Sequence, residues 1–174
     1  RDQHARVRGA SIRFCFRGKG GKSHDVDIHD RRLAKSVKRC RDLPGQELFQ
    51  YLDDRDRRQN VKSGDVNDYL REISGDDFTA KDFRTWAGTM LAAEALQECA
   101  PFETAGQAKR SVNRAIECVA ERLGNTPAIC KKCYVHPEIL EAYLDGSLAE
   151  ALGPGEIRKG RASLSANEIS VVQL

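Results

Sequence analysis

A short stretch late in the chain places a tyrosine, Tyr134, nine residues after an amide side chain, Asn125. A Thr-Pro pair between them predicts the start of a helix. A phenol near its reference pKa of about 10 is a weak nucleophile at pH 7, so phenolate chemistry needs nearby cations that favour the charged form. Lys131 and Lys132 come just before the phenol and are candidates for that role. The same spacing also fits a structural tyrosine on a short amphipathic helix.

Residues 4–29 alternate apolar and polar side chains, which is typical of strands. Apolar side chains occupy every second position from Ile12 to Phe16, with Arg13 and Cys15 between them. A glycine-rich turn follows, and a second alternating run returns to residue 29. The pattern predicts an N-terminal β-hairpin or small antiparallel sheet with Lys19 at the hairpin tip.

From residue 30 the apolar spacing becomes helical. Leu33, Val37 and Cys40 are predicted to form the inner face of the first helix. The charged stretch 53–58 is typical of a surface loop, and the next helix is predicted to close at Ser74-Gly75.

The helix that begins at residue 79 is predicted to be the central core helix. Thr79 and Asp82 form a capping-box pattern, and Arg84 follows in the first turns. Arg84 could be a surface residue, or an anion ligand at a helix N-terminus where dipole and guanidinium act together. The apolar positions at helical spacing are Phe83, Ala87, Met90, Leu91 and Leu96.

Two further helices are predicted around the tyrosine. Residues 103–123 form one, ended by Gly124, and Pro137 begins the other. The inner positions predicted for the first of these are Ala108, Val112, Ile116 and Val119. Together the patterns predict an α+β, mainly α-helical fold. We expect one domain over residues 1–153, with the hairpin at 4–29 and a helical part at 30–153, and then a linker and the start of a helix at 154–174.

The 174 residues suffice for one well-buried domain, and their charge is unevenly distributed. Residues 1–42 carry 13 Lys and Arg against 5 Asp, a net charge of +8, whereas the remainder carries 16 basic and 21 acidic residues, a net charge of −5. This asymmetry fits either a face for a polyanion or a solvated charged surface. The sequence contains no apolar run near the roughly 18 residues of a membrane span, so no membrane partner is expected.

The six cysteines are single residues within amphipathic patterns rather than a disulfide framework, which favours reduced, cytosolic thiols. Cys130 and Cys133 have the spacing of a zinc or redox pair. A second Cys pair or a spaced His pair is missing, so no metal site is expected.

Three motifs, taken in order, resemble the catalytic domain of type IB DNA topoisomerases in their bacterial, poxvirus-like branch. They are Phe16-Arg17-Gly18-Lys19 at a hairpin, Lys81-Asp82-Phe83-Arg84-Thr85-Trp86 opening a helix, and Leu123-Gly124-Asn125-Thr126-Pro127 nine residues before Tyr134. The resemblance covers roughly residues 1 to 150. Each motif is modest, and their combined order and spacing is specific.

The resemblance implies that Tyr134 attacks a DNA phosphodiester and forms a 3′-phosphotyrosyl bond. Lys19 would protonate the departing 5′-oxygen, while Arg84 and Asn125 would bind non-bridging oxygens. The chemistry needs neither ATP, a nucleotide cofactor nor a metal, and relaxes supercoils after a transient nick. The resemblance also implies that the partner is double-stranded DNA and that the protein acts as a monomer. The implied location is the nucleoid in the cytoplasm. The implied DNA-binding residues are Arg17, Lys22, Lys81, Lys131 and Lys132.

The chain departs from the family pattern in two places. Many relatives have histidine where Asn125 stands, and asparagine still donates a hydrogen bond but cannot carry a full charge. The family also uses an arginine upstream of the hairpin, whose motif Arg6 and Arg8 do not match. We therefore expect that this arginine and an N-terminal DNA-clamp domain precede Arg1, and that the chain as it stands is impaired in cleavage.

Two other functions remain open from the sequence. A tyrosine recombinase shares the catalytic fold, although Lys81 occupies the place of its usual histidine, and Trp86 and Asn125 favour a topoisomerase. A non-catalytic DNA-binding module would use the basic N-terminal region to hold phosphates.

Overall fold

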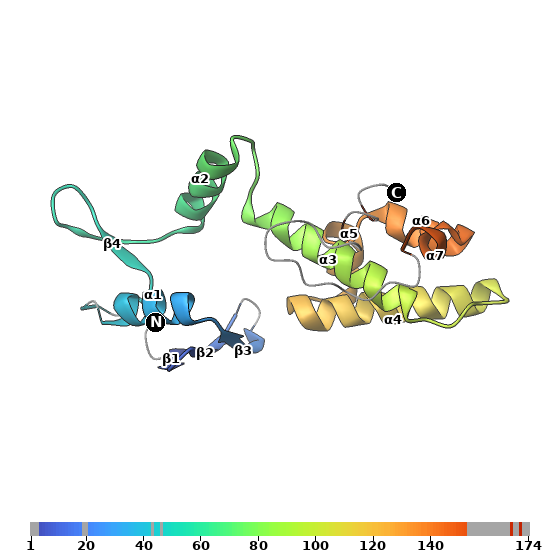
Figure 1. Ribbon diagram of the computed structural model, residues 1–174, viewed down its shortest axis with the longest axis horizontal. Helices are drawn as coiled ribbons and strands as arrows, with labels where there is room; N and C mark the ends of the chain where they lie inside the picture. Colours follow the sequence, from blue (N-terminus) through green and yellow to red (C-terminus); the bar gives the residue numbers. More distant parts are fainter. Residues whose placement is uncertain are drawn as a thin grey trace. The chain divides into compact units, whose positions relative to one another are not determined.

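A three-stranded antiparallel sheet begins the chain, in the order β1 (Ala5–Arg8), β2 (Ser11–Arg17) and β3 (Ser23–His29) (Figure 1). The computed structural model describes residues 4–18, 21–42, 44–45, 47–152, 168 and 171. It divides the chain into two units, Arg1–Phe78 and Thr79–Leu174. The register pairs Ile12 with Ile28 and Phe14 with Val26, so the alternating pattern is confirmed as paired strands with their apolar side chains on one face.

Helix α1 (Arg31–Arg41) packs against β1 and β2 and forms the core of the first unit. Asp30 caps it, because its carboxylate accepts from the backbone amides of Arg32 and Leu33. The predicted inner face was wrong at Leu33, which is 49% exposed. The sheet instead contacts the face of Ala34, a small side chain that lets helix and strand come close. The buried residues of this core are Ala5, Ile12, Ala34, Val37 and Leu48.

The charged stretch 53–58 is not wholly a loop, because Arg58 lies in a strand. Strands β4 (Gln50–Leu52) and β5 (Arg58–Asn60) pair in a second hairpin. The turn between them is organised by Asp53, whose carboxylate accepts from the backbone amides of Arg55 and Arg57. Such side chain to backbone bonds favour turns, and the charged composition alone did not reveal them.

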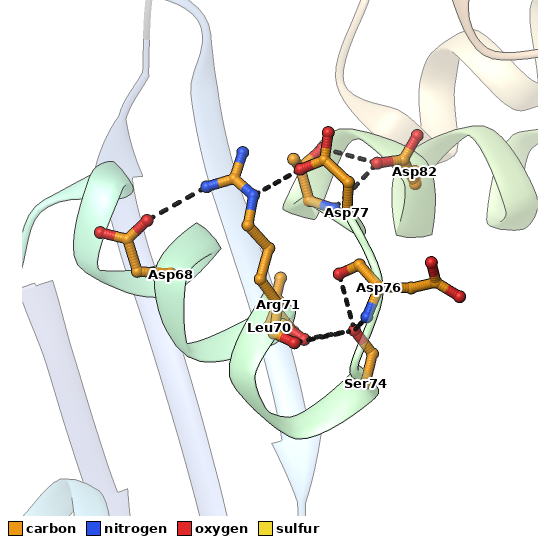
Figure 2. Close-up of polar contacts among 8 residues, drawn as sticks. Asp68, Leu70, Arg71, Ser74, Asp76, Asp77 and Asp82 are labelled. Carbon is orange, nitrogen blue, oxygen red and sulfur yellow. Dashed lines mark hydrogen bonds and ion pairs between the residues drawn. The ribbon is translucent and has the colours of Figure 1, made fainter.

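Helix α2 (Ser63–Ser74) ends at Gly75 in the left-handed conformation, as predicted. None of its side chains is buried. Figure 2 shows the polar contacts at its C-terminal end. Arg71 pairs with Asp68 and Asp77, and the Ser74 hydroxyl donates to the Leu70 carbonyl at 2.7 Å.

The second unit is helical. Helix α3 (Ala80–Gln97) packs against α4 (Ala105–Leu123), α6 (Pro137–Asp145) and α7 (Ser147–Leu152), and α4 packs against α5 (Pro127–Cys133) (Figure 1). The inner positions predicted for α4 are all buried. A sheet followed by helices confirms the α+β, mainly α-helical class.

The inner face of α3 differs from the prediction. Phe83 is 57% exposed and Ala87 is exposed, whereas Gly88 and Thr89 are buried. The buried face follows the neighbouring segments of the second unit, which come close enough to require small side chains at these positions. The larger apolar residues Met90 and Leu96 are buried as predicted.

The predicted linker and helix start at 154–174 lie almost wholly outside the described residues. Glu168 is described, and its carboxylate accepts a hydrogen bond of 3.2 Å from Nε1 of Trp86 on α3. Val171 packs against the main core of the second unit.

Candidate active site

The first turn of α3 is fixed by its capping box. The Asp82 carboxylate accepts from the backbone amide of Thr79 at 2.8 Å and from its hydroxyl at 2.6 Å (Figure 2). These bonds lower the pKa of Asp82 below its ordinary value. The box therefore contributes stability above the unfolded pKa of about 3.9, and this contribution is lost as the pH falls through the lower folded value.

Arg84, one turn into this helix, contacts two elements that follow much later in the chain. Its Nη2 donates to the Leu123 carbonyl at 2.8 Å. Its guanidinium carbon lies 5.1 Å from the centroid of the Tyr134 ring. This is cation–π distance, so the exposed arginine side chain lies against the phenol ring.

The turn that ends α4 presents the amide side chain. Gly124 has a φ of 69°, and the backbone amides of Gly124 and Asn125 donate back to Glu121 and Ala120, which is a Schellman motif. Asn125 Nδ2 donates to the Leu123 carbonyl at 3.2 Å. One carbonyl therefore accepts from both the guanidinium and the carboxamide, and places these donors side by side.

Tyr134 directly follows the last residue of α5. Thr126 caps this helix with Pro127 in its first turn, as the Thr-Pro pair predicts. The tyrosine amide donates to the Cys130 carbonyl at 2.9 Å, and the side chain is half-buried. Arg84 thus links the other two side chains, because it contacts the Tyr134 ring and shares the Leu123 carbonyl with Asn125.

Comparison with known proteins identifies the family of the chain. The family model described as "Eukaryotic DNA topoisomerase I, catalytic core" matches residues 1–150. The chain belongs to this topoisomerase family. It is also 30% identical over 150 residues to the DNA topoisomerase 1B of Acanthamoeba polyphaga mimivirus, an alignment that covers 82% of the chain and 45% of the viral protein. The chain therefore spans about half the length of that relative. The family match also decides between topoisomerase and tyrosine recombinase, in favour of the former.

The remaining predicted site residues of this topoisomerase family member lie elsewhere. Lys19 is outside the described residues. Arg17 and Lys22 flank the hairpin tip in the first unit, where the Gly18 amide donates to the Lys22 carbonyl at 2.8 Å. Lys81 is exposed in the first turn of α3. Asn125, Arg84 and Tyr134 are the predicted catalytic residues that the second unit brings together.

The cation over the phenol is Arg84, not one of the two lysines before it in sequence. Lys131 and Lys132 are exposed on α5. Lys131 lies beside the first half of α4, whereas Arg84 contacts the last residue of that helix. The hollow that Lys131 lines also includes residues 102–105, 108–109, 112–113 and 144. The lysines remain predicted DNA contacts.

Sequence reasoning missed the residues that hold the tyrosine backbone. Thr85, Gly88 and Thr89 share a face of α3 and contact residues 133–136. The available signal was their spacing, since positions i, i+3 and i+4 fall on one helical face, combined with their small size. The Leu123 carbonyl was also missed, because a backbone acceptor leaves no trace in residue type.

All six cysteines are free thiols in the structure, with Cys130 buried and Cys133 half-buried. Among the described residues, His, Cys, Asp and Glu side chains form no group of three or more that could hold a metal ion. No helix in the described part of the chain combines the length and hydrophobicity of a membrane span.

Proposed function

We propose that this chain breaks and rejoins one strand of duplex DNA through a 3′-phosphotyrosyl intermediate on Tyr134, and so relaxes supercoils. The observation that carries the proposal is the position of Arg84. Its guanidinium lies over the Tyr134 ring and shares the Leu123 carbonyl with Asn125. A phosphate bound by the remaining N–H groups of Arg84 would lie beside the phenol and the carboxamide together.

In the cleavage step, Tyr134 Oη releases its proton to solvent and forms a bond to phosphorus while the bond from phosphorus to the 5′-oxygen breaks. Negative charge accumulates on the non-bridging oxygens, where Arg84 and Asn125 donate hydrogen bonds. Arg84 uses one N–H on Leu123 and keeps others for phosphate, and the Asn125 amide nitrogen has a second hydrogen. Lys19 supplies the proton that the 5′-oxygen needs.

Religation reverses the same step. The 5′-hydroxyl attacks phosphorus, the bond to Tyr134 breaks, and the phenol regains a proton. Because one phosphodiester is exchanged for another, the cycle consumes no ATP and calls for no redox partner. We further propose that one chain acts as a monomer on DNA of the nucleoid, with phosphates bound by Arg17, Lys22, Lys81, Lys131 and Lys132.

The test uses supercoiled plasmid, which offers many cleavage sequences, in buffer with EDTA and without ATP. Relaxation is followed on gels, and covalent complexes are trapped with SDS and seen as nicked circles that retain protein. Tyr134→Phe is expected to abolish both signals. Tyr143→Phe is the matched control, because that buried hydroxyl has no hydrogen-bond partner among the described residues.

The proposal requires an SDS-stable adduct from the unaltered chain that disappears in Tyr134→Phe and persists in Tyr143→Phe. Adduct formation is followed over a long incubation at saturating protein, because impaired cleavage is expected to be slow. DNA binding with no adduct at any time would instead support the non-catalytic module. An adduct that survives in Tyr134→Phe would place the nucleophile elsewhere.

A further inference from the structure

We propose that Thr85, Gly88 and Thr89 of α3 are positioning residues that clasp the backbone around Tyr134 and set its hydroxyl against Arg84. The inference rests on the proposed function, since it concerns the placement of the nucleophile. Its basis is three contacts between one face of α3 and residues 133–136 of the same unit.

Gly88 makes the closest approach. A Cβ built on it would lie 2.3 Å from the Tyr134 carbonyl oxygen and 3.1 Å from the carbonyl carbon. Both are backbone atoms, so a rotamer change could not relieve the overlap. Any side chain at this position must move the tyrosine backbone away from α3, or move α3 itself.

Thr89 holds the chain two residues after the tyrosine. Its hydroxyl oxygen accepts from the His136 backbone amide at 3.1 Å, and the residue is 5% exposed. The acceptor belongs to a buried side chain, and a hydroxyl buried without its hydrogen-bond partner is costly, so this bond ties His136 to α3. His136 is also the N-cap of α6, which carries the constraint into the core.

Thr85 contacts the chain one residue before the tyrosine. Its hydroxyl is 3.3 Å from the Cys133 carbonyl and 3.1 Å from the Lys81 carbonyl, so its single hydrogen is shared between a contact across elements and one within the helix. The contacts of Thr85 and Thr89 therefore bracket Tyr134, with Gly88 against its own carbonyl.

The clasp is adjacent to Arg84, which precedes Thr85 on the same helix. Gly88 follows Arg84 by four residues, or about 6 Å along the axis. The helix that carries the phosphate-binding guanidinium thus also holds the backbone of the nucleophile. Because a displacement of about 1 Å between reacting groups can cost roughly 10²-fold in rate, this common support matters for the chemical step.

The core anchors Cys130 and Val135 also flank the tyrosine and are buried. If they alone position Tyr134, the α3 contacts affect folding stability and nothing more. The clasp predicts something different, namely a loss in the rate of cleavage that exceeds any loss in DNA affinity or thermal stability.

The experiment compares Gly88→Ala, Thr89→Val and Thr89→Ser with the unaltered chain. Valine keeps the shape of threonine without an acceptor, whereas serine keeps the hydroxyl. Gly106→Ala is the matched control, since within the described part of the chain a Cβ there meets just one atom, the Thr104 hydroxyl oxygen at 4.0 Å. Three quantities are measured: the rate of SDS-trapped adduct formation on plasmid at saturating protein, the dissociation constant for DNA, and the melting temperature.

We expect adduct formation to fall about 10²-fold in Gly88→Ala and at least 10-fold in Thr89→Val, with the dissociation constant within about threefold of the unaltered chain. Thr89→Ser should restore most of the rate, and Gly106→Ala should behave as the unaltered chain. If Gly88→Ala does not fold, the valine and serine pair decides.

Folded Thr89→Val and Gly88→Ala proteins that cleave at the unaltered rate would overturn the clasp, as would equal losses in Thr89→Val and Thr89→Ser. These results leave the proposed function standing, because the unaltered chain would still form a Tyr134-dependent adduct. Absence of that adduct in the unaltered chain would contradict both the proposed function and the clasp.

Discussion

At the scale of single residues, Arg84 combines two tasks that a simpler cation could not. It donates to the Leu123 carbonyl at 2.8 Å and lies over the Tyr134 ring at 5.1 Å, and its planar fork still has donors for a phosphate. A lysine ammonium is a compact point charge on a flexible stem. It cannot donate to the Leu123 carbonyl, lie over the ring and bind a phosphate at the same time.

Arg84→Lys is therefore expected to slow adduct formation by about 10²-fold or more, although the charge is unchanged. Arg110→Lys is the control, because Arg110 is exposed on α4 and donates a local hydrogen bond from Nε to the Gly106 carbonyl. The measurement is the rate of SDS-trapped cleavage at saturating protein. A near-normal rate in Arg84→Lys would show that charge alone suffices at this position.

At the scale of elements, the turn that ends α4 supplies both the Leu123 acceptor and the Asn125 donor. Its geometry depends on Gly124, whose φ of 69° lies in the left-handed region that side chains with a Cβ disfavour. The Schellman bonds of this turn hold Asn125 where its side chain donates to the Leu123 carbonyl, which Arg84 also contacts.

Gly124→Ala is expected to lower the free energy of unfolding by about 1 kcal/mol and to reduce cleavage, because relief of the strained turn shifts Asn125. Gly124→Asn should be milder in both respects, since asparagine tolerates the left-handed conformation better than alanine. Chemical denaturation gives the first quantity and adduct formation the second. Equal effects of the two substitutions would argue against the backbone conformation as the cause.

At the scale of the whole molecule, charge is divided along the chain. The N-terminal 42 residues carry a net charge of +8, and the exposed strand ends and α1 present many of these cations. The rest of the chain, which holds the Tyr134 constellation, carries −5. We expect the basic part to supply most of the affinity for DNA phosphates and the constellation to supply the chemistry.

DNA affinity should fall steeply with salt, because each neutralised phosphate releases counterions. The double variant Arg17→Ala/Lys22→Ala should reduce the slope of log affinity against log salt by about 2, or about 1 per lost phosphate contact. Lys109→Ala, an exposed lysine on α4, is the control. Fluorescence anisotropy over a salt series measures the slopes. An unchanged slope in the double variant would remove the hairpin tip from the DNA interface.

Local signals determined much of the framework. Thr79 and Thr126 cap helices where their sequence patterns indicate, and Gly75 and Gly124 end helices in the left-handed conformation. These features depend on side chain to backbone bonds within a few residues, so they can be read before any tertiary contact is known. The order of motifs likewise indicated the family that the comparisons established.

Tertiary structure decided which side of α3 is buried and what Arg84 contacts. Periodicity favoured Phe83 and Ala87 for the core, but the close approach of residues 133–136 buries Gly88 and Thr89 instead. Sequence also left Arg84 as either a surface residue or an anion ligand, and only the structure shows that its exposed guanidinium contacts the Leu123 carbonyl, 39 positions away. Residue types carry local conformational preference, whereas the partner of a helix face is chosen by how closely distant backbones can pack.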